Sequence, residues 1–232
     1  MKTTGIILMA GNSIRYNKGY NKNLEILNSE YIFLYSLKVF NNNKNIKDII
    51  LVIRECDKDI ILDILNKLNF NKKINLVIGG NSRMESVYNA ITSTNSDIVV
   101  IHDSARPFIK DKYINDGIEA MNDYLGAITC VPVKDTIKII NENNEIIEST
   151  NRIYTYIGQT PQIFNRQKLV ELHQKYKNNN SITDDAMLLE QEEIKLKVID
   201  GDYQNIKITT KEDIIIAEQF IKNVKLFKTL QI

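Results

Sequence analysis

The sequence predicts an α/β fold in which a mostly parallel, twisted sheet carries helices on both faces. Short runs rich in β-branched residues alternate along the chain with longer amphipathic segments, as in doubly wound sheets. Several of the short runs are apolar throughout, which is typical of strands covered on both faces. At 232 residues, the chain is long enough to bury the core of one such domain.

The candidate strands are short and largely apolar, and they cover residues 4–10, 47–54, 74–80, 97–103, 126–133, 196–201 and 205–210. The candidate helices are amphipathic and cover residues 30–42, 57–69, 82–93, 110–123, 166–177, 183–192 and 211–228. The last helix follows Thr210, a residue type that caps helices. Acidic residues lie in its first turn, where they stabilise a helix. No repeat, linker or low-complexity stretch divides the sequence, so residues 1–232 are predicted to form a single domain.

Residues 134–153 break the alternation of strands and helices. They form two short extended runs around the polar sequence NENNE, which predicts a β-hairpin arm. The arm is rich in isoleucine, and a surface of this kind needs a cover in water. These isoleucines are Ile137, Ile139, Ile140, Ile146 and Ile147. The arm can pack on its own domain or on a second subunit; we favour the second, which predicts a homodimer.

The charge balance and the rare residues exclude several classes of protein. The 30 basic and 29 acidic residues leave a net charge of +1, too small for a general nucleic-acid binder. No apolar run approaches the roughly 20 residues that span a bilayer. We therefore expect a cytoplasmic protein with neither nucleic-acid nor membrane partners. Cys56 and Cys130 lie far apart without a CxxC pattern, which argues against a disulfide framework or a zinc site.

The first candidate strand leads into a loop that suits a phosphate chain. The loop reads Ala10-Gly11-Asn12-Ser13-Ile14-Arg15, with Lys18 and Lys22 beyond it. Gly11 allows backbone N–H groups to approach a ligand, and the cations can neutralise phosphate charge. Neither GxxxxGK[ST] nor GxGxxG is present. Taken alone, the loop also fits a lysine-rich surface turn.

A second polar segment, Gly79-Gly80-Asn81-Ser82-Arg83-Met84-Glu85-Ser86, lies between a strand and a helix. It fits a binding turn for a base or a phosphate, and equally an ordinary N-capped turn. A third segment, His102-Asp103-Ser104-Ala105-Arg106, follows the apolar run IVVI. A carboxylate at the end of a buried strand is costly unless it is paired or binds a cation. Asp103 is therefore a candidate ligand for Mg²⁺, with a structural Asp103–Arg106 pair as the alternative. His102 is expected to be structural.

Later in the chain, two cations and two hydroxyls are candidates to bind an anionic substrate: Thr136, Arg152, Thr160 and Lys207. For Lys207 the alternative is a side chain that lies along a strand edge. Asp184 and Asp185 are expected to cap and charge the start of a helix.

Together these motifs resemble the cytidylyltransferases that make CDP-alcohols from sugar-alcohol phosphates. The matching segments are GGNSRMESV, IHDSARPF, VPVKDTIK, GQTPQIF, ITDDA and NIKITTKED, in the family's order along nearly the whole chain. The resemblance implies a Rossmann-like nucleotidyltransferase fold, a β-arm that interlocks two subunits, and release of pyrophosphate from CTP. VPVKDTIK and Ala105 favour 2-C-methyl-D-erythritol 4-phosphate, of the non-mevalonate isoprenoid pathway, as the acceptor. Ribitol 5-phosphate is the alternative acceptor.

The resemblance also implies residue roles. The catalytic positions match Arg15, Lys22, Asp103 and Lys207, and Asp103 is also the expected metal ligand. The CTP side comprises Met9, Ala10, Gly11, Gly80, Asn81, Arg83 and Ser86. The alcohol-phosphate side comprises Arg106, Thr136, Arg152, Thr160 and Lys207, with Thr136 and Arg152 reaching in from the other subunit. No covalent intermediate is required, so catalysis would rest on positioning and on charge stabilisation by these cations and Mg²⁺.

The first loop departs from the family pattern, which resembles AAGxGxRM followed by a Pro-Lys pair. Ser13 stands at the second glycine position, and Asn21 replaces the proline before Lys22. A serine restricts how closely the backbone approaches the triphosphate, and the loss of proline leaves the loop less constrained. We therefore expect weaker CTP binding than in a typical member. A catalytically degenerate CTP-binding module is the alternative from another class.

Overall fold

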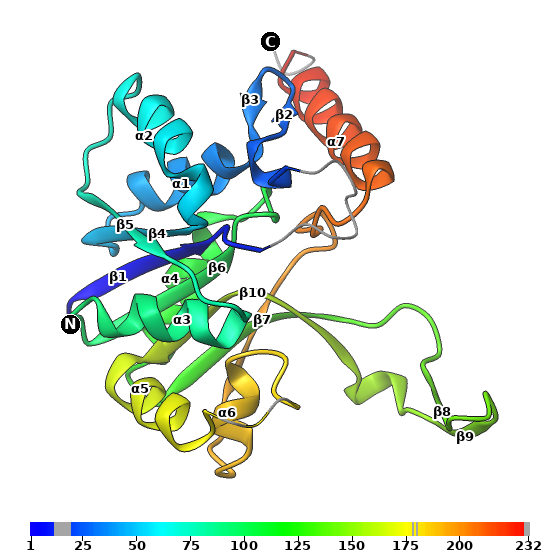
Figure 1. The fold of residues 1–232 in the computed structure, drawn as a ribbon. Helices are drawn as coiled ribbons and strands as arrows, with labels where there is room; N and C mark the ends of the chain where they lie inside the picture. The colour runs from blue at the N-terminus through cyan, green and yellow to red at the C-terminus, as the bar shows by residue number, and fades with distance from the viewer. Residues whose placement is uncertain (12–19, 178, 180, 230–232) are drawn as a thin grey trace.

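In the computed structural model, which describes residues 1–11, 20–177, 179 and 181–229, the chain forms a seven-stranded sheet (Figure 1). In sheet order the strands are β11 (Lys197–Asp200), β7 (Gly126–Pro132), β10 (Tyr156–Asn165), β6 (Ile98–Asp103), β1 (Thr3–Leu8), β4 (Asp48–Ile53) and β5 (Ile74–Ile78). All neighbours pair in parallel except β10, which is antiparallel to both β6 and β7. The predicted mostly parallel sheet is confirmed.

Helices cover both faces of this sheet. One face carries α1 (Ile32–Asn42), α2 (Lys58–Asn66) and α4 (Asp111–Ala120). The other carries α3 (Arg83–Thr92), α5 (Arg166–Lys175) and α6 (Ala186–Glu190). The last helix, α7 (Lys211–Thr229), packs beside the small hairpin β2 (Ile26–Leu27) and β3 (Glu30–Tyr31). The described residues also form the short 3₁₀ turns η2 (Lys22–Leu24), η3 (Glu55–Asp57) and η4 (Arg152–Tyr154).

Successive residues of a central strand point to opposite faces, so one strand serves two cores. On β6, Ile98 and Val100 join the core under α1 and α4, whereas Val99 and Ile101 join the core under α3 and α5. All four side chains are at most 1% exposed. Burial on both faces explains why this run lacks polar alternation in the sequence.

The antiparallel strand β10, which carries Thr160, was not among the strands predicted from the sequence. Its middle carries the polar residues Gln159 and Thr160 and then Pro161, which has no backbone N–H. The pairing with β7 also shifts register between Gly158 and Gln162. A strand with such an interruption shows neither a continuous apolar run nor a regular alternation.

The predicted strand at 205–210 was wrong, because this segment pairs with no strand of the described sheet. Ile208 supplied the apolar signal; its side chain is fully buried next to α7, and its N–H donates to the carbonyl oxygen of Ala105 at 2.8 Å. The predicted helix at 183–192 is shorter than expected and corresponds to α6.

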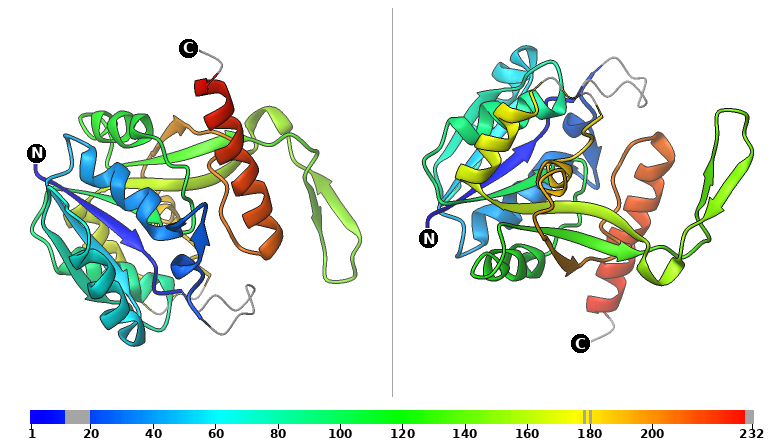
Figure 2. Two further views of the ribbon diagram at one scale, coloured as in Figure 1. Left: turned by 90° about the horizontal axis from the view of Figure 1, so that it is seen from above. Right: turned by 90° about the horizontal axis from the view of Figure 1, so that it is seen from below.

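The predicted hairpin arm is present as β8 (Lys138–Ile140) and β9 (Ile146–Ser149), which pair antiparallel. Both figures show the arm projecting away from the body of the molecule (Figures 1 and 2). Ile146 and Ile147 are 64% and 63% exposed. Within the described ranges, no helix has the length and apolar character needed to cross a membrane.

Candidate active site

The carboxyl ends of the parallel strands meet at one edge of the sheet, and the predicted site residues follow them. Asp103 ends β6 and is in register with Leu8, which ends β1. Met9 and Ala10 follow β1 directly, and Gly79–Gly80 follow β5. A Cβ atom on Gly79 would lie only 2.4 Å from Cβ of Ala10. Glycine therefore allows the loops after β1 and β5 to touch.

Asp103 lies between two cations that come from distant parts of the chain. Lys207 Nζ donates to Asp103 Oδ2 at 2.6 Å, and Arg83 Nε lies 3.8 Å from Oδ1. Burial opposes ionisation of Asp103, but Arg83 and Lys207 outweigh it and hold its pKa well below the usual range. Asp103 is therefore an anion at neutral pH, and it joins the segment around Lys207 to the start of α3.

Arg106 does not form the structural pair with Asp103 that was weighed as an alternative; Lys207 and Arg83 take that place. Arg106 Nη1 donates instead to the carbonyl oxygen of Asn205 at 2.8 Å. Its buried Nε–H has no hydrogen-bond partner among the described residues. Burial lowers the pKa of Arg106, and Asp103 partly opposes this shift. Arg106 is thus held at the edge through Asn205, with one buried donor that no described residue accepts.

His102 and Thr160 support Asp103 from inside the protein. The Asp103 N–H donates to Thr160 Oγ1 at 3.1 Å. His102 Nε2 lies 3.0 Å from the Arg106 carbonyl oxygen, which can only accept, so the neutral imidazole carries its hydrogen on Nε2. His102 Nδ1 therefore accepts from the Thr160 hydroxyl at 3.0 Å. Burial lowers the pKa of His102 to about 4. His102 is therefore neutral and structural, as predicted. Thr160 is 5% exposed, and its hydroxyl is hydrogen-bonded to Asp103 and His102 inside the protein.

Arg83 connects Asp103 to a second carboxylate that sequence reasoning misplaced. Asp185 was expected to cap a helix, but it is fully buried, with Oδ2 2.7 Å from Arg83 Nη1 and Oδ1 3.3 Å from His173 Nε2. Burial opposes its ionisation, yet Arg83 outweighs this and lowers the pKa of Asp185. The neighbouring Asp184 does the capping, because its Oδ1 accepts an N–H of α6 at 3.1 Å. The sequence could have indicated this difference, because two adjacent acids at the start of a helix cannot both face the same turn.

The turn before α3 is held by reciprocal capping bonds. Ser82 Oγ accepts the Glu85 N–H at 3.0 Å, and Glu85 Oε2 accepts the Asn81 N–H at 2.6 Å. Ser86 Oγ accepts the Gly80 N–H at 3.0 Å. The N-capped turn is therefore confirmed, and the nucleotide contacts of Gly80, Asn81 and Ser86 stay a prediction.

The family model described as 2-C-methyl-D-erythritol 4-phosphate cytidylyltransferase matches residues 4–223 of this chain. The chain belongs to this family. It is therefore a cytidylyltransferase, a class of nucleotidyltransferase.

Several known proteins are similar to this chain over nearly its whole length. The 2-C-methyl-D-erythritol 4-phosphate cytidylyltransferase of Caldanaerobacter subterraneus subsp. tengcongensis is 39% identical, over 96% of this chain and 100% of its own. The Clostridium tetani protein of the same name is 43% identical, over 97% of this chain and 93% of its own. The crystal structure of 4-diphosphocytidyl-2C-methyl-D-erythritol synthase from Anaerococcus prevotii superposes with a TM-score of 0.85 at 34% identity, covering 95% of this chain and 98% of that one.

The first loop differs from the cytidylyltransferase pattern, and part of it lies outside the described residues, including Ser13 and Arg15. Lys22 begins η2 and is half-buried. The expectation that Asn21 leaves Lys22 less constrained is wrong for this segment, because Asn21 is fully buried and hydrogen-bonded on both sides of its amide. A buried side-chain network therefore holds the residue that stands where the family pattern has a proline.

The arm residues of the cytidylyltransferase pattern are not joined to this cluster within one chain. Thr136 and Arg152 are both exposed. In the described part of the chain, neither side chain is hydrogen-bonded or ion-paired to a residue at the strand ends. Their predicted contact with the alcohol phosphate stays a prediction that needs a second subunit.

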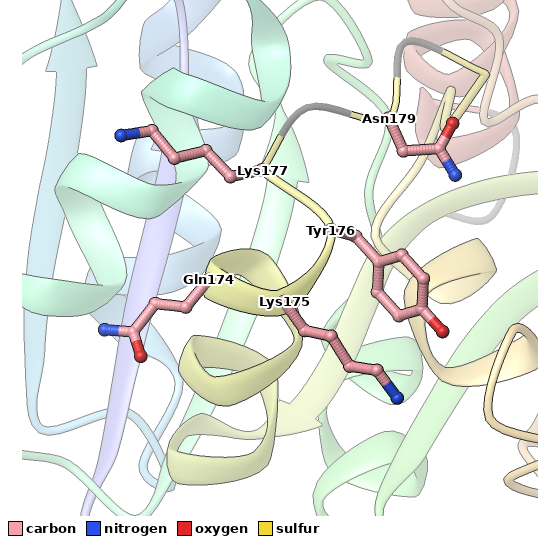
Figure 3. Close-up of a pocket in the computed structure, with 5 residues that line it drawn as sticks. All are labelled: Gln174, Lys175, Tyr176, Lys177 and Asn179. Carbon is pink, nitrogen blue, oxygen red and sulfur yellow. The ribbon is translucent and has the colours of Figure 1, made fainter.

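A surface hollow of about 530 Å³ lies elsewhere, at the end of α5 (Figure 3). Gln174 and Lys177 point to one side of the chain there, whereas Lys175 and Tyr176 point to the other. Lys175 and Tyr176 are hydrogen-bonded to the same oxygen of Glu192. None of the predicted site residues lines this hollow, so it is separate from the strand-end cluster.

Proposed function

We propose that this protein transfers the cytidylyl group of CTP to 2-C-methyl-D-erythritol 4-phosphate, giving 4-diphosphocytidyl-2-C-methyl-D-erythritol and pyrophosphate. Membership of the family supports this reaction. The observation that carries it in this chain is the Lys207–Asp103–Arg83 cluster. This cluster joins the segment predicted to hold the acceptor phosphate to the segment predicted to hold the nucleotide.

In the proposed reaction, a phosphate oxygen of the acceptor attacks the α-phosphorus of CTP in line. The bond from the α-phosphorus to the α,β-bridging oxygen breaks, and pyrophosphate leaves with that oxygen. Negative charge spreads over the phosphoryl oxygens in the transition state, and fixed cations stabilise it. Lys22 and Arg15 are proposed to hold the triphosphate. The other groups on the CTP side are proposed to be Met9, Ala10, Gly11, Gly80, Asn81, Arg83 and Ser86.

The acceptor phosphate is proposed to bind Lys207 and Arg106 of one subunit. Asp103 holds the Lys207 ammonium at 2.6 Å, so this cation is placed before the substrate arrives. The Arg106 guanidinium, held by its bond to the Asn205 carbonyl oxygen, is proposed to supply a second positive charge. Thr136 and Arg152 of the other subunit are proposed to complete the site. Thr160 acts by fixing the backbone of Asp103 through its hydroxyl.

The residues present fit a Mg²⁺ ion that arrives with CTP. Mg²⁺ takes one or two protein carboxylates and completes its shell with water and phosphate oxygens. The described residues contain no group of three or more His, Cys, Asp or Glu side chains able to hold a resident metal. Asp103 is the proposed protein ligand, and the bound ion would withdraw charge from the phosphate oxygens.

We further propose that the protein is a single-domain, cytoplasmic homodimer whose arm packs on the second subunit. The exposed isoleucines of β8 and β9 support the dimer, because they form an apolar surface with no cover in one chain among the described residues. The near-neutral charge supports the proposal that nucleic acid is not a partner.

The test is pyrophosphate release by the purified protein with CTP and Mg²⁺, with methylerythritol 4-phosphate in one reaction and ribitol 5-phosphate in another. We expect release with the first acceptor only. The relatives reported above all carry the methylerythritol name, which favours this acceptor. Release with ribitol 5-phosphate alone would replace the acceptor. CTP binding without release in either reaction would favour the degenerate module.

A further inference from the structure

Asn21 is a polar residue with no exposed surface, and it directly precedes Lys22. Its amide makes a full set of four hydrogen bonds. Nδ2 donates to the Met9 carbonyl oxygen and to Asp57 Oδ2, both at 2.8 Å. Oδ1 accepts from the backbone N–H of Asn23 at 3.1 Å and from its Nδ2 at 2.9 Å. A flipped amide would place its oxygen against two acceptors, so the partners determine its orientation.

Asp57 is itself anchored on the side away from Asn21. Arg54 Nε and Nη2 bind its two carboxylate oxygens, each at 2.7 Å, in the bidentate geometry that best fixes orientation. Burial opposes ionisation of Asp57, but the hydrogen bonds from Arg54 and Asn21 outweigh it and lower its pKa. Arg54 follows β4 without a gap. The network is therefore attached to the sheet.

The Arg54–Asp57–Asn21 network joins three segments at the same edge of the sheet. It holds the end of β4 through Arg54, the residue after β1 through Met9, and the start of η2 through Asn21. Met9 and Lys22 both belong to the proposed CTP site. Asn21 caps η2, and Lys22 is the first residue of that turn, so the position of the lysine backbone depends directly on Asn21.

We propose that Asn21 is a positioning residue for Lys22: it holds the lysine backbone against Met9 so that the ammonium group meets the triphosphate of CTP. This inference rests on the proposed function, because it assigns Lys22 to the nucleotide. Asn21 touches no substrate and acts through Lys22. Asp57 and Arg54 provide the anchor that makes the position rigid.

The test is a double-mutant cycle between Asn21 and Lys22, measured as kcat and as the KM for each substrate. We expect Asn21→Ala to lower kcat by about 30-fold, with the KM for the acceptor changed less than about 3-fold. In a Lys22→Ala background, the same change should lower kcat by less than about 3-fold. A full 30-fold effect in both backgrounds would overturn the proposal, because Asn21 would then act independently of Lys22.

A backbone-matched variant separates the side-chain bonds from simple stiffness. Asn21 has a φ of −70°, which proline adopts without strain. Asn21→Pro therefore keeps the backbone but removes the amide and its four bonds. We expect Asn21→Pro to lose activity as Asn21→Ala does. Wild-type kcat in Asn21→Pro would overturn the role of the side-chain network.

Asn43→Ala is the matched control for a general loss of stability. Asn43 is 1% exposed and donates to Asp111 at 2.6 Å and to Asn115 at 2.8 Å, away from Lys22. We expect its kcat to equal that of the wild type, and equal losses in Asn21→Ala and Asn43→Ala would overturn the proposal. If Asn21→Ala does not fold, Asp57→Asn enters the same cycle under the same criterion. Failure of the wild type to release pyrophosphate would instead reject the proposed function.

Discussion

The strand-end cluster and the hairpin arm present their residues in opposite ways. At the strand ends, Lys207 and Arg83 are already placed around Asp103 within one chain, and Asp103 is only 13% exposed at its side chain. On the arm, Ile146 and Ile147 are more than half exposed and their two strands pair only with each other among the described elements. One region is complete in a single chain, whereas the other exposes an apolar surface that we propose a second subunit covers.

Different interactions therefore hold the two halves of the proposed site in place. The strand ends are fixed by a core that is buried on both faces of the sheet. The arm is fixed only by its own short ladder, and an isolated two-stranded hairpin is marginally stable in water. We therefore expect changes at the strand ends to act on chemistry directly, and changes on the arm to act through assembly.

The largest expected effect is at the centre of the strand-end cluster. Asp103→Asn removes the anion that holds Lys207 and is the proposed metal ligand, so we expect kcat to fall about a thousandfold. Steady-state pyrophosphate release measures it. Asp48→Asn, at the start of β4 and therefore at the opposite edge of the sheet from Asp103, is the control and should keep the wild-type kcat. Equal activity in Asp103→Asn would remove Asp103 from the site.

The arm should respond next, and through its oligomeric state. Ile146→Asp places a charge on the surface proposed to be buried between subunits, so we expect a monomer and a loss of activity of about a hundredfold. Light scattering and pyrophosphate release measure the two effects. Ile60→Asp changes an isoleucine on α2 that is 45% exposed and should change neither. A dimeric, active Ile146→Asp variant would contradict the assignment of the arm.

The smallest expected effect concerns the stability of the strand-end region in acid. The pKa of His102 is about 4 in the folded protein, against an ordinary value of 6.5. The unfolded chain therefore binds a proton first, and stability is lost as pH falls from 6.5 towards 4. Between pH 7.5 and pH 5, this group should cost about 2 kcal/mol of unfolding free energy.

Urea unfolding at these two pH values measures the acid effect. His102→Gln is less stable at both, but it should lose about 2 kcal/mol less than the wild type between them. An equal loss in both proteins would show that His102 titrates normally. The arm contains no histidine, so removing its apolar surface should leave this pH dependence unchanged.

Much of the fold follows from the sequence because the parallel strands are buried on both faces. Ile98, Val99, Val100 and Ile101 are all apolar for that reason, and the charged residue that ends such a run marks the site. The predictions of Asp103 and of the arm both rest on this contrast between an apolar run and what interrupts it. The β10 strand was not predicted, because its interruption, at Pro161, lies inside the strand.

The residues that sequence reasoning missed or misjudged are those whose partners are distant in the chain. In the sequence, Asn21 resembles an ordinary loop residue. In the structure, its side-chain amide donates to Asp57, which lies 36 positions further along the chain. The sequence predicts that Asp185 caps a helix, whereas in the structure it is paired with Arg83 and His173. Polar residues carry no periodicity that predicts burial, so only the three-dimensional structure identifies these networks.

The most direct test of the shared site is complementation between two inactive proteins. Asp103→Asn damages the strand ends and keeps the arm intact, whereas Arg152→Ala damages the arm and keeps the strand ends. After the subunits are mixed in equal amounts and allowed to exchange, half of the dimers combine one of each and hold one intact site. We expect activity to return to about one quarter of the wild-type level. No recovery in mixtures shown to contain mixed dimers would contradict a site built from the strand ends of one subunit and the arm of the other.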